Sequence, residues 1–234
     1  MTYVRSASRS LCLAGLVLGL ITLFTAASAR AEVGAQWAVG DYDAKETPAS
    51  VQANKLEKGI TLLTTVLKSS VEFSCSNIEL INVELIGEGK LKEGGKAKFT
   101  GCLTKIKGVE SKACVPHSKG QAAGTVESLE TKGEIVLHEK AGITKLEPKS
   151  GETLVTLEMG EECPFGEKIP ILGKLTLKDP ELTTLLVQHL IVQGPLTELW
   201  VISKTAEHVA TVDGEAKVKL SGAHEGAEWC GAPG

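Results

Sequence analysis

The 234-residue chain is short of two residue types that many binding proteins depend on. All three of its arginines, Arg5, Arg9 and Arg30, fall within the first 31 residues, and aromatic side chains make up only 4% of the sequence. Arginine is the preferred residue for holding phosphate or carboxylate groups, and nucleic-acid-binding domains need a basic surface. The sequence therefore predicts no nucleic acid, phosphorylated ligand or anionic membrane surface as a partner.

Motifs for catalysis and metal binding are missing as well. The sequence contains no CxxC pair, no G-x-S-x-G elbow and no G-G-x-G-x-D calcium repeat. His224-Glu225 begins like the zinc-protease motif HExxH, but Glu228 stands where the second histidine must be. We therefore expect no metal and no cofactor, and no catalytic residue is assigned among the five histidines, His117, His138, His189, His208 and His224.

Carboxylates are the remaining candidates for catalysis or metal binding. Glycoside hydrolysis needs two of them at a set separation, and Glu158, Glu161 and Glu162 lie near Cys163. Sugar sites usually also use aromatic platforms, and only seven aromatic residues follow residue 31. Calcium needs six or more oxygen ligands, whereas the acidic stretch of residues 41–46 offers three carboxylates, those of Asp41, Asp43 and Glu46.

The N-terminus predicts export. Arg5 and Arg9 precede an apolar run over residues 11–24, which is followed by small residues that end in Ala29 or Ala31. This three-part pattern is typical of a secretory signal peptide, and 14 apolar residues fall short of the roughly 20 that span a bilayer. We therefore expect residues 1–31 to be removed and the protein to be secreted or held at the cell surface.

The chain after residue 31 keeps five cysteines, which an exported protein normally uses in disulfides. We predict one bond between Cys102 and Cys114, which would close a local loop, and a second between Cys75 and Cys163. Cys230 is then left free or used between chains. The same part of the chain has 22 lysines against 29 acidic residues, a net charge of −7, which predicts a solvated surface.

Glycine punctuates the middle of the chain and predicts its fold class. It recurs every ninth residue over residues 124–160, at Gly124, Gly133, Gly142, Gly151 and Gly160. One short strand and one turn fit this spacing, so we expect a mainly β protein in which an antiparallel meander forms a β-sandwich or barrel-like domain, with each of these glycines at or beside a turn.

The flanking segments complete the predicted organisation. Residues 32–59 read as a loosely packed polar arm in which Thr47-Pro48 can open a short helix, residues 60–227 as a single antiparallel β domain, and residues 228–234 as a surface tail. Residues 179–193 are flanked by residues that typically begin and end a helix, but their interior suits a buried strand equally well. Asp213-Gly214 reads as a hairpin turn.

Several stretches together show a family resemblance. FTGC at residues 99–102, CPFGEKIPI at residues 163–171, and the run from Leu196 to Gly222 followed by His224, Gly226 and Trp229 are similar to uncharacterised secreted proteins of soil actinobacteria. The resemblance implies export and a β-rich fold, and it implies no activity.

The sequence thus favours an exported, non-enzymatic β domain with a structural, adhesive or ligand-holding role, acting on a cell-surface component or a small ligand. Two alternatives stay open. One is a secreted hydrolase for glycosides or esters, with a site assembled across strands. The other is a carrier that holds a small apolar ligand inside a barrel-like sheet.

Overall fold

The computed structural model describes residues 35–40, 42–43, 48–138, 141–178, 187–192 and 197–233. Its first half contains β1 (Ala35–Val39), β2 (Tyr42–Asp43), β3 (Ala49–Val66), β4 (Ser69–Cys75), β5 (Asn77–Ile81), β6 (Glu84–Ile86), β7 (Lys90–Thr100), β8 (Leu103–Ile106) and β9 (Val109–Glu110). A single turn of 3-10 helix, η1 (Lys112–Cys114), and strands β10 (Thr125–Glu127), β11 (Thr131–His138), β12 (Ala141–Pro148) and β13 (Thr153–Glu158) follow. The last part contains β14 (Lys168–Lys178), β15 (Val187–Val192), β16 (Glu198–Ser203), β17 (Ala206–Ser221), η3 (Gly222–His224) and β18 (Trp229–Pro233).

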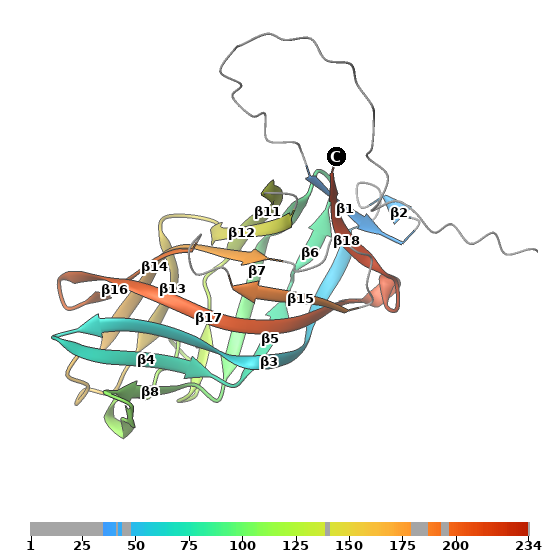
Figure 1. Cartoon of the computed structure of the whole chain (residues 1–234). Coiled ribbons are helices and arrows are strands. Elements are labelled where there is room, and N and C mark those ends of the chain that lie inside the picture. The colour runs from blue at the N-terminus through green and yellow to red at the C-terminus, as the bar shows by residue number, and fades with distance from the viewer. Residues whose placement is uncertain are drawn as a thin grey trace, which may run out of the picture.

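Fifteen of these strands form one sheet, and the sheet closes on itself. Neighbouring strands follow the order β17-β16-β14-β12-β11-β7-β6-β3, and β3 pairs back to β17 along most of its length. Every pairing among the described residues is antiparallel, which confirms the predicted mainly β, antiparallel, barrel-like fold. Figure 1 shows β3 and β17 running lengthwise, with the small sheet of β1, β2 and β18 at one end and the β16–β17 and β3–β4 turns at the other.

Alternating side chains place one face of each strand inside. In β16, Leu199, Val201 and Ser203 are buried, whereas Glu198, Trp200 and Ile202 are more exposed. Such a period of two is what a strand with one face on a core requires. Branched and aliphatic residues therefore fill the interior, while lysine and glutamate cover the outside.

The glycine spacing turns out to mark units twice as long as predicted. Strands β12 and β13 both pair antiparallel with β14, so they run in the same direction and form one wall segment with an interruption at residues 149–152. Strands β10 and β11 stand in the same relation to β7, with an interruption at residues 128–130. Residues 124–160 therefore form long, interrupted strands rather than a run of short hairpins.

Only part of the turn prediction survives. Gly124 and Gly151 lie in turns with positive φ, Gly142 is the second residue of β12, and Gly160 directly follows β13. Gly133 contradicts the prediction, because it lies within β11 at a register shift against β7. A Cβ atom there would lie 2.7 Å from the Lys145 carbonyl oxygen, so glycine serves close backbone approach and not a turn.

The predicted arm and tail are both part of the folded body. β1 from the expected arm pairs with β18 from the expected tail over five residue pairs. Trp37 is 7% exposed and Trp229 is 3% exposed, and their rings pack with centroids 5.9 Å apart. Residues 49–59 belong to β3. Hydrophobic packing between the chain ends therefore overrides their polar composition.

Two further local predictions have outcomes in the structure. Residues 187–192 of the ambiguous segment form strand β15, while residues 179–186 and 193 lie outside the described residues, as do Thr47 and the predicted signal peptide. Asp213-Gly214 is not a hairpin, because β17 continues through it. The pairing with β3 shifts register there, so the glycine marks a bulge.

The predicted disulfide pairing is wrong, although the four cysteines are right. The bonds join Cys75 to Cys102 and Cys114 to Cys163. The register of β5 against β7 pairs Asn77 with Thr100, which carries Cys75 and Cys102 to opposite positions at the end of that ladder. No described cysteine is free, so the expectation of a free thiol at Cys230 is wrong too.

The second bond follows from another strand contact. His117 pairs with Glu158 through both backbone hydrogen bonds, so the segment after η1 runs beside the end of β13. Cys114 and Cys163 are thereby brought together across 49 residues of sequence. The predicted local loop over residues 102–114 is wrong because strand register, and not proximity in sequence, decides which cysteines meet.

Candidate functional site

An internal cavity of about 270 Å³ lies inside the closed sheet. Its lining residues are mostly aliphatic or aromatic, and they come from strands on all sides of the barrel-like wall. Only six of them carry a polar side chain: Lys92, Lys96, Ser128, Thr131, Thr144 and Glu215. The cavity is therefore an apolar chamber with a few polar groups in its wall.

The cavity separates two hydrophobic clusters. One cluster contributes Leu62, Phe73, Val126, Leu157, Ile171, Leu199 and Val212 to the cavity wall. The other contributes Trp37, Val51, Leu85, Val218 and Trp229. Because protein interiors are normally packed as densely as organic crystals, a core divided in this way marks space that the chain's own side chains leave unfilled.

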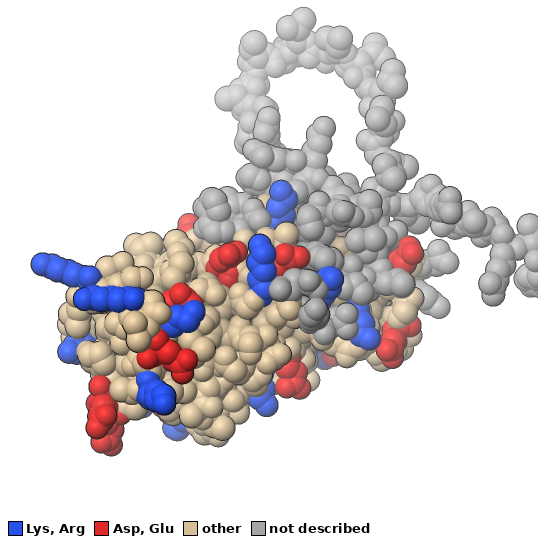
Figure 2. Space-filling model, turned by 60° about the horizontal axis from the view of Figure 1, so that its bottom comes forward, with Lys and Arg blue, Asp and Glu red and all other residues tan. Residues whose placement is uncertain are grey.

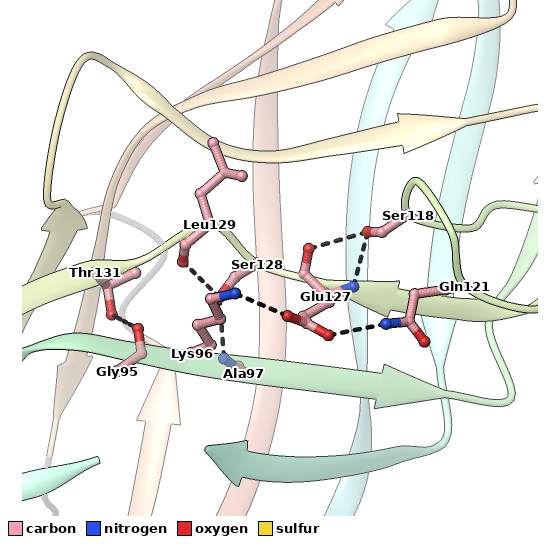
Figure 3. A network of polar contacts seen from close by, with 9 residues as sticks. All are labelled: Gly95, Lys96, Ala97, Ser118, Gln121, Glu127, Ser128, Leu129 and Thr131. Atoms are coloured by element: carbon pink, nitrogen blue, oxygen red, sulfur yellow. Dashed lines mark hydrogen bonds and ion pairs between the residues drawn. The ribbon is translucent and has the colours of Figure 1, made fainter. Parts of the chain in front are cut away.

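Three of the six polar lining residues, Lys96, Ser128 and Thr131, lie along one seam, which we call the polar seam and define as residues 95–97 of β7 with residues 127–131 (Figure 3). Residues 128–130 of the seam lie between the end of β10 and the start of β11, and side chains there add hydrogen bonds to the wall. Ser128 accepts a hydrogen bond from the Ala97 backbone N–H at 2.9 Å and donates to the Leu129 carbonyl oxygen at 2.9 Å. The Thr131 hydroxyl donates to the Gly95 carbonyl oxygen at 2.9 Å.

Lysine charges at the cavity wall are matched by glutamates. Lys96 Nζ lies 3.0 Å from Glu127 Oε1, and Gln121 donates to the other oxygen of the same carboxylate at 3.0 Å. Lys92 lies between 2.9 and 3.0 Å from both oxygens of Glu84. Both lysines are therefore paired with a carboxylate, and neither presents an uncompensated positive charge to the cavity.

Two tryptophans at the cavity differ in how their indole N–H groups are used. Trp37 Nε1 donates to the Lys90 carbonyl oxygen at 3.0 Å. Trp229 Nε1 is buried and has no hydrogen-bond partner among the described residues. A buried donor without a partner costs about 1–3 kcal/mol relative to a hydrogen-bonded one.

A second hollow, of about 550 Å³, lies on the outside of the sheet. Its lining includes Trp200 and four carboxylates, those of Glu147, Glu152, Glu198 and Glu207. Lys132 and Lys174 each lie 3.2 Å from Glu147, and their hydrogen bonds lower the pKa of this carboxyl. A lowered pKa is the opposite of what a catalytic general acid requires.

The histidines named in the sequence are distributed over several elements. His117 bridges to β13, with its Nε2 3.9 Å from Glu158 Oε2, His208 lies in β17 and buried His224 in η3. The backbones of His138 and His189 lie in β11 and β15. Among the described residues, no three His, Cys, Asp or Glu side chains are grouped to hold a metal ion.

The candidate carboxylates also lack a shared cleft. Glu158 contacts His117 and Lys168, at 3.9 and 3.7 Å, whereas Glu161 and Glu162 are exposed in the turn after β13. Of the proposed calcium ligands, Asp43 lies in β2, while Asp41 and Glu46 fall outside the described residues.

Sequence reasoning missed Trp229, Trp37 and Val51 as cavity residues. Each lies in a segment that reads as polar arm or tail, and the signal that marks them is the pairing of β1 with β18 and of β3 with β17, which no local pattern reveals.

The outer surface carries mixed charge. On the face shown in Figure 2, lysines and acidic residues are interspersed, and neither sign forms a continuous patch. Within the described residues, no helix is long and apolar enough to cross a membrane. The two disulfides are typical of proteins that fold in an oxidising, extracytoplasmic compartment.

Comparison with known proteins gives no assignment: no family model, curated protein or solved structure matches the chain. Any functional inference therefore depends on the cavity, the seam and the surface of this chain alone.

Proposed function

We propose that this protein is an exported, non-enzymatic β domain that holds a small apolar ligand in its internal cavity. The observation that supports the proposal is the cavity of about 270 Å³ between the two hydrophobic clusters. The proposal selects the ligand-holding role and the carrier from the functions that the sequence leaves open.

Physical chemistry favours an apolar occupant. Apolar cavities of this kind stay dry and take up apolar molecules, because water gains too few hydrogen bonds inside them. At about 30 Å³ for each water molecule in the liquid, the cavity corresponds to about nine waters. Small-molecule pockets range from about 300 to 1,000 Å³, so the ligand belongs at the small end of that range.

Export is supported by the signal-peptide pattern in residues 1–31 and by the two disulfides. A carrier outside the cell protects an apolar molecule from water, which suits a chamber whose walls are aliphatic and a surface that is coated with lysine and glutamate.

A hydrolase has weaker support. The external hollow brings carboxylates together, but Glu147 is held by two lysines that lower its pKa. A structural or adhesive role needs no internal cavity, and nothing in the described residues gives the cavity a part in such a role.

Titration of the secreted protein with the monocyclic hydrocarbon menthane tests the proposal. Calorimetry at several temperatures should show saturable binding with a negative heat-capacity change, the signature of apolar burial. Absence of saturable binding by menthane and by smaller cyclic hydrocarbons would contradict the proposal.

A matched pair of variants locates the bound molecule. Val212→Phe adds an aromatic ring inside the cavity and should abolish binding. Val209→Phe, on the same strand but 73% exposed, adds the same ring outside and should leave binding unchanged. Equal effects of the two substitutions would place the ligand elsewhere.

A further inference from the structure

We infer that the external hollow binds a neutral saccharide, with one sugar ring stacked on Trp200. The inference goes beyond the proposed function and does not rest on it, because the lining of this hollow shares no residue with the lining of the internal cavity. The volume of about 550 Å³ falls within the range of about 300–1,000 Å³ that small-molecule sites occupy. The inference is carried by the position of Trp200 and by the charged side chains beside it.

Trp200 presents an aromatic surface on the outer face of the sheet. Its neighbours in β16, Leu199 and Val201, are buried, so Trp200 points outward and is half-buried. Strand register places Trp200 between Leu172 of β14 and Val209 of β17, which is 73% exposed, and these three side chains form an apolar strip. The negative face of an aromatic ring suits the weakly positive C–H groups on the flat side of a sugar ring.

A row of charged side chains runs beside the apolar strip. Register pairs Lys132 with Glu147 and Lys174 with Glu198, and Glu147 lies 3.2 Å from each of the two lysines. Glu198 lies two residues before Trp200 in the same strand, so both side chains are on the outer face. The hollow therefore places hydrogen-bonding groups next to an apolar strip, as a sugar ring places hydroxyl groups around an apolar face.

The charges around the hollow favour a neutral ligand. Its lining contains three lysines and four glutamates. An anion would face the carboxylates of Glu198 and Glu207, whereas a cation would face the ammonium group of Lys174. A hydroxyl group donates to a carboxylate and accepts from an ammonium group, so it suits both kinds of neighbour.

Three of the four carboxylates are open to such a ligand. Glu147 is held by two lysines, but Glu152, Glu198 and Glu207 are exposed, and their side chains have no ion pair or hydrogen bond to another described residue. Within the same part of the chain, no three carboxylates are close enough together to hold a metal ion. A polyhydroxylated ligand can therefore bond to them without breaking a contact of the folded protein.

Calorimetric titration of the full secreted protein with tetrasaccharides tests the inference. Three probes are neutral: cellotetraose, mannotetraose and fully acetylated chitotetraose. Two analogues of cellotetraose add charge: the glucosamine tetramer, a cation in mildly acidic buffer, and the oxidised form in which carboxylates replace the primary alcohols. At least one neutral probe should bind saturably, and both charged analogues should bind at least about tenfold more weakly than the best neutral probe.

Two matched pairs of variants locate the bound sugar. Trp200→Thr keeps a residue that favours strands and should weaken binding of the best neutral probe at least about tenfold, whereas Val209→Thr, outside the hollow, should not change it. Glu198→Gln should weaken binding about threefold. Glu110→Gln alters an exposed carboxylate of β9 that does not line the hollow, and it should have no effect.

Nuclear magnetic resonance of the wild type gives a readout that does not depend on the folding of a variant. The chain has three tryptophans, so three indole N–H signals are expected. The best neutral probe should shift the Trp200 signal and leave the signals of Trp37 and Trp229 in place, because these two residues are only 7% and 3% exposed.

The outcomes separate this inference from the carrier proposal. Val212→Phe should abolish menthane binding and leave sugar binding unchanged, and Trp200→Thr should do the reverse. The inference is overturned if none of the three neutral probes binds, or if a charged analogue binds more tightly than all of them. Equal effects of Trp200→Thr and Val209→Thr, or an unmoved Trp200 signal, would also overturn it.

Discussion

One added methylene group inside the cavity should stabilise the protein, whereas the same addition in its packed core should destabilise it. Val212 lines the cavity, and the Val212→Leu substitution places an extra methylene in unfilled space. Burial of a methylene contributes about 0.8 kcal/mol, so the free energy of unfolding should rise by about that amount.

Val201 provides the matched comparison. It is 0% exposed, belongs to the same hydrophobic cluster as Val212 and does not line the cavity. Overpacking a filled core costs about 1–3 kcal/mol, so Val201→Leu should lower the free energy of unfolding by that amount. Both substitutions make the same chemical change within a strand, so a difference of sign between them reports on the space around each side chain.

Urea denaturation of the two variants, with disulfides intact, measures both values. The account predicts opposite signs for the change in midpoint. If Val212→Leu destabilises the protein as much as Val201→Leu, the space beside Val212 is not available to a ligand and the reasoning fails.

Three other predictions concern the two disulfides, one glycine of β14 and one carboxylate of β12. Cys75→Ser should lower the free energy of unfolding by about 3.5 kcal/mol and Cys114→Ser by about 4 kcal/mol, because the lost bonds close loops of 27 and 49 residues. Peptide mapping without reduction should find the 75–102 and 114–163 pairs. Recovery of a peptide that links residues 102 and 114 would refute the strand register. Gly173 has φ +114°, and a Cβ atom there would collide with the Glu198 carbonyl oxygen. Gly173→Ala should therefore lower the free energy of unfolding, measured by thermal denaturation, by more than about 3 kcal/mol. Gly151→Ala, where φ is +67° and the space is open, should cost only about 1 kcal/mol, and equal losses would contradict the prediction. Hydrogen bonds from Lys132 and Lys174 lower the Glu147 pKa from its ordinary 4.5, so this carboxylate stabilises the fold above about pH 4.5 and the contribution is lost as pH falls through the lowered pKa. Glu147→Gln should therefore lower stability at neutral pH by less than about 1 kcal/mol and match the wild type in acid, and a deficit that grows in acid would reverse the sign.

The fold class was predictable from the sequence because it depends on local composition. Stretches rich in Val, Ile, Leu and Thr form strands, and glycine marks where those strands end, bulge or approach another backbone. Strand pairing was not predictable, since it joins residues far apart. The Leu67-Lys68 turn between β3 and β4 shows the limit: both residues have positive φ, which a tight hairpin turn needs but which neither residue type favours.

The sequence indicated what kind of site the protein could have, but not where that site lies. A closed sheet with aliphatic inner residues allows a cavity, and the sequence keeps a carrier among its alternatives for that reason. Its position depends on Trp37 and Trp229, which β1 and β18 bring together from opposite ends of the chain. The unused N–H of Trp229 depends on that packing, so no local motif could indicate it.

Xenon binding tests the central claim most directly, because xenon enters apolar cavities without any specific recognition. Crystals of the protein pressurised with xenon should show a xenon atom between the two hydrophobic clusters, bordered by Leu62, Val212 and Trp229. Density for xenon only at the outer surface, with none between the clusters, would contradict the account.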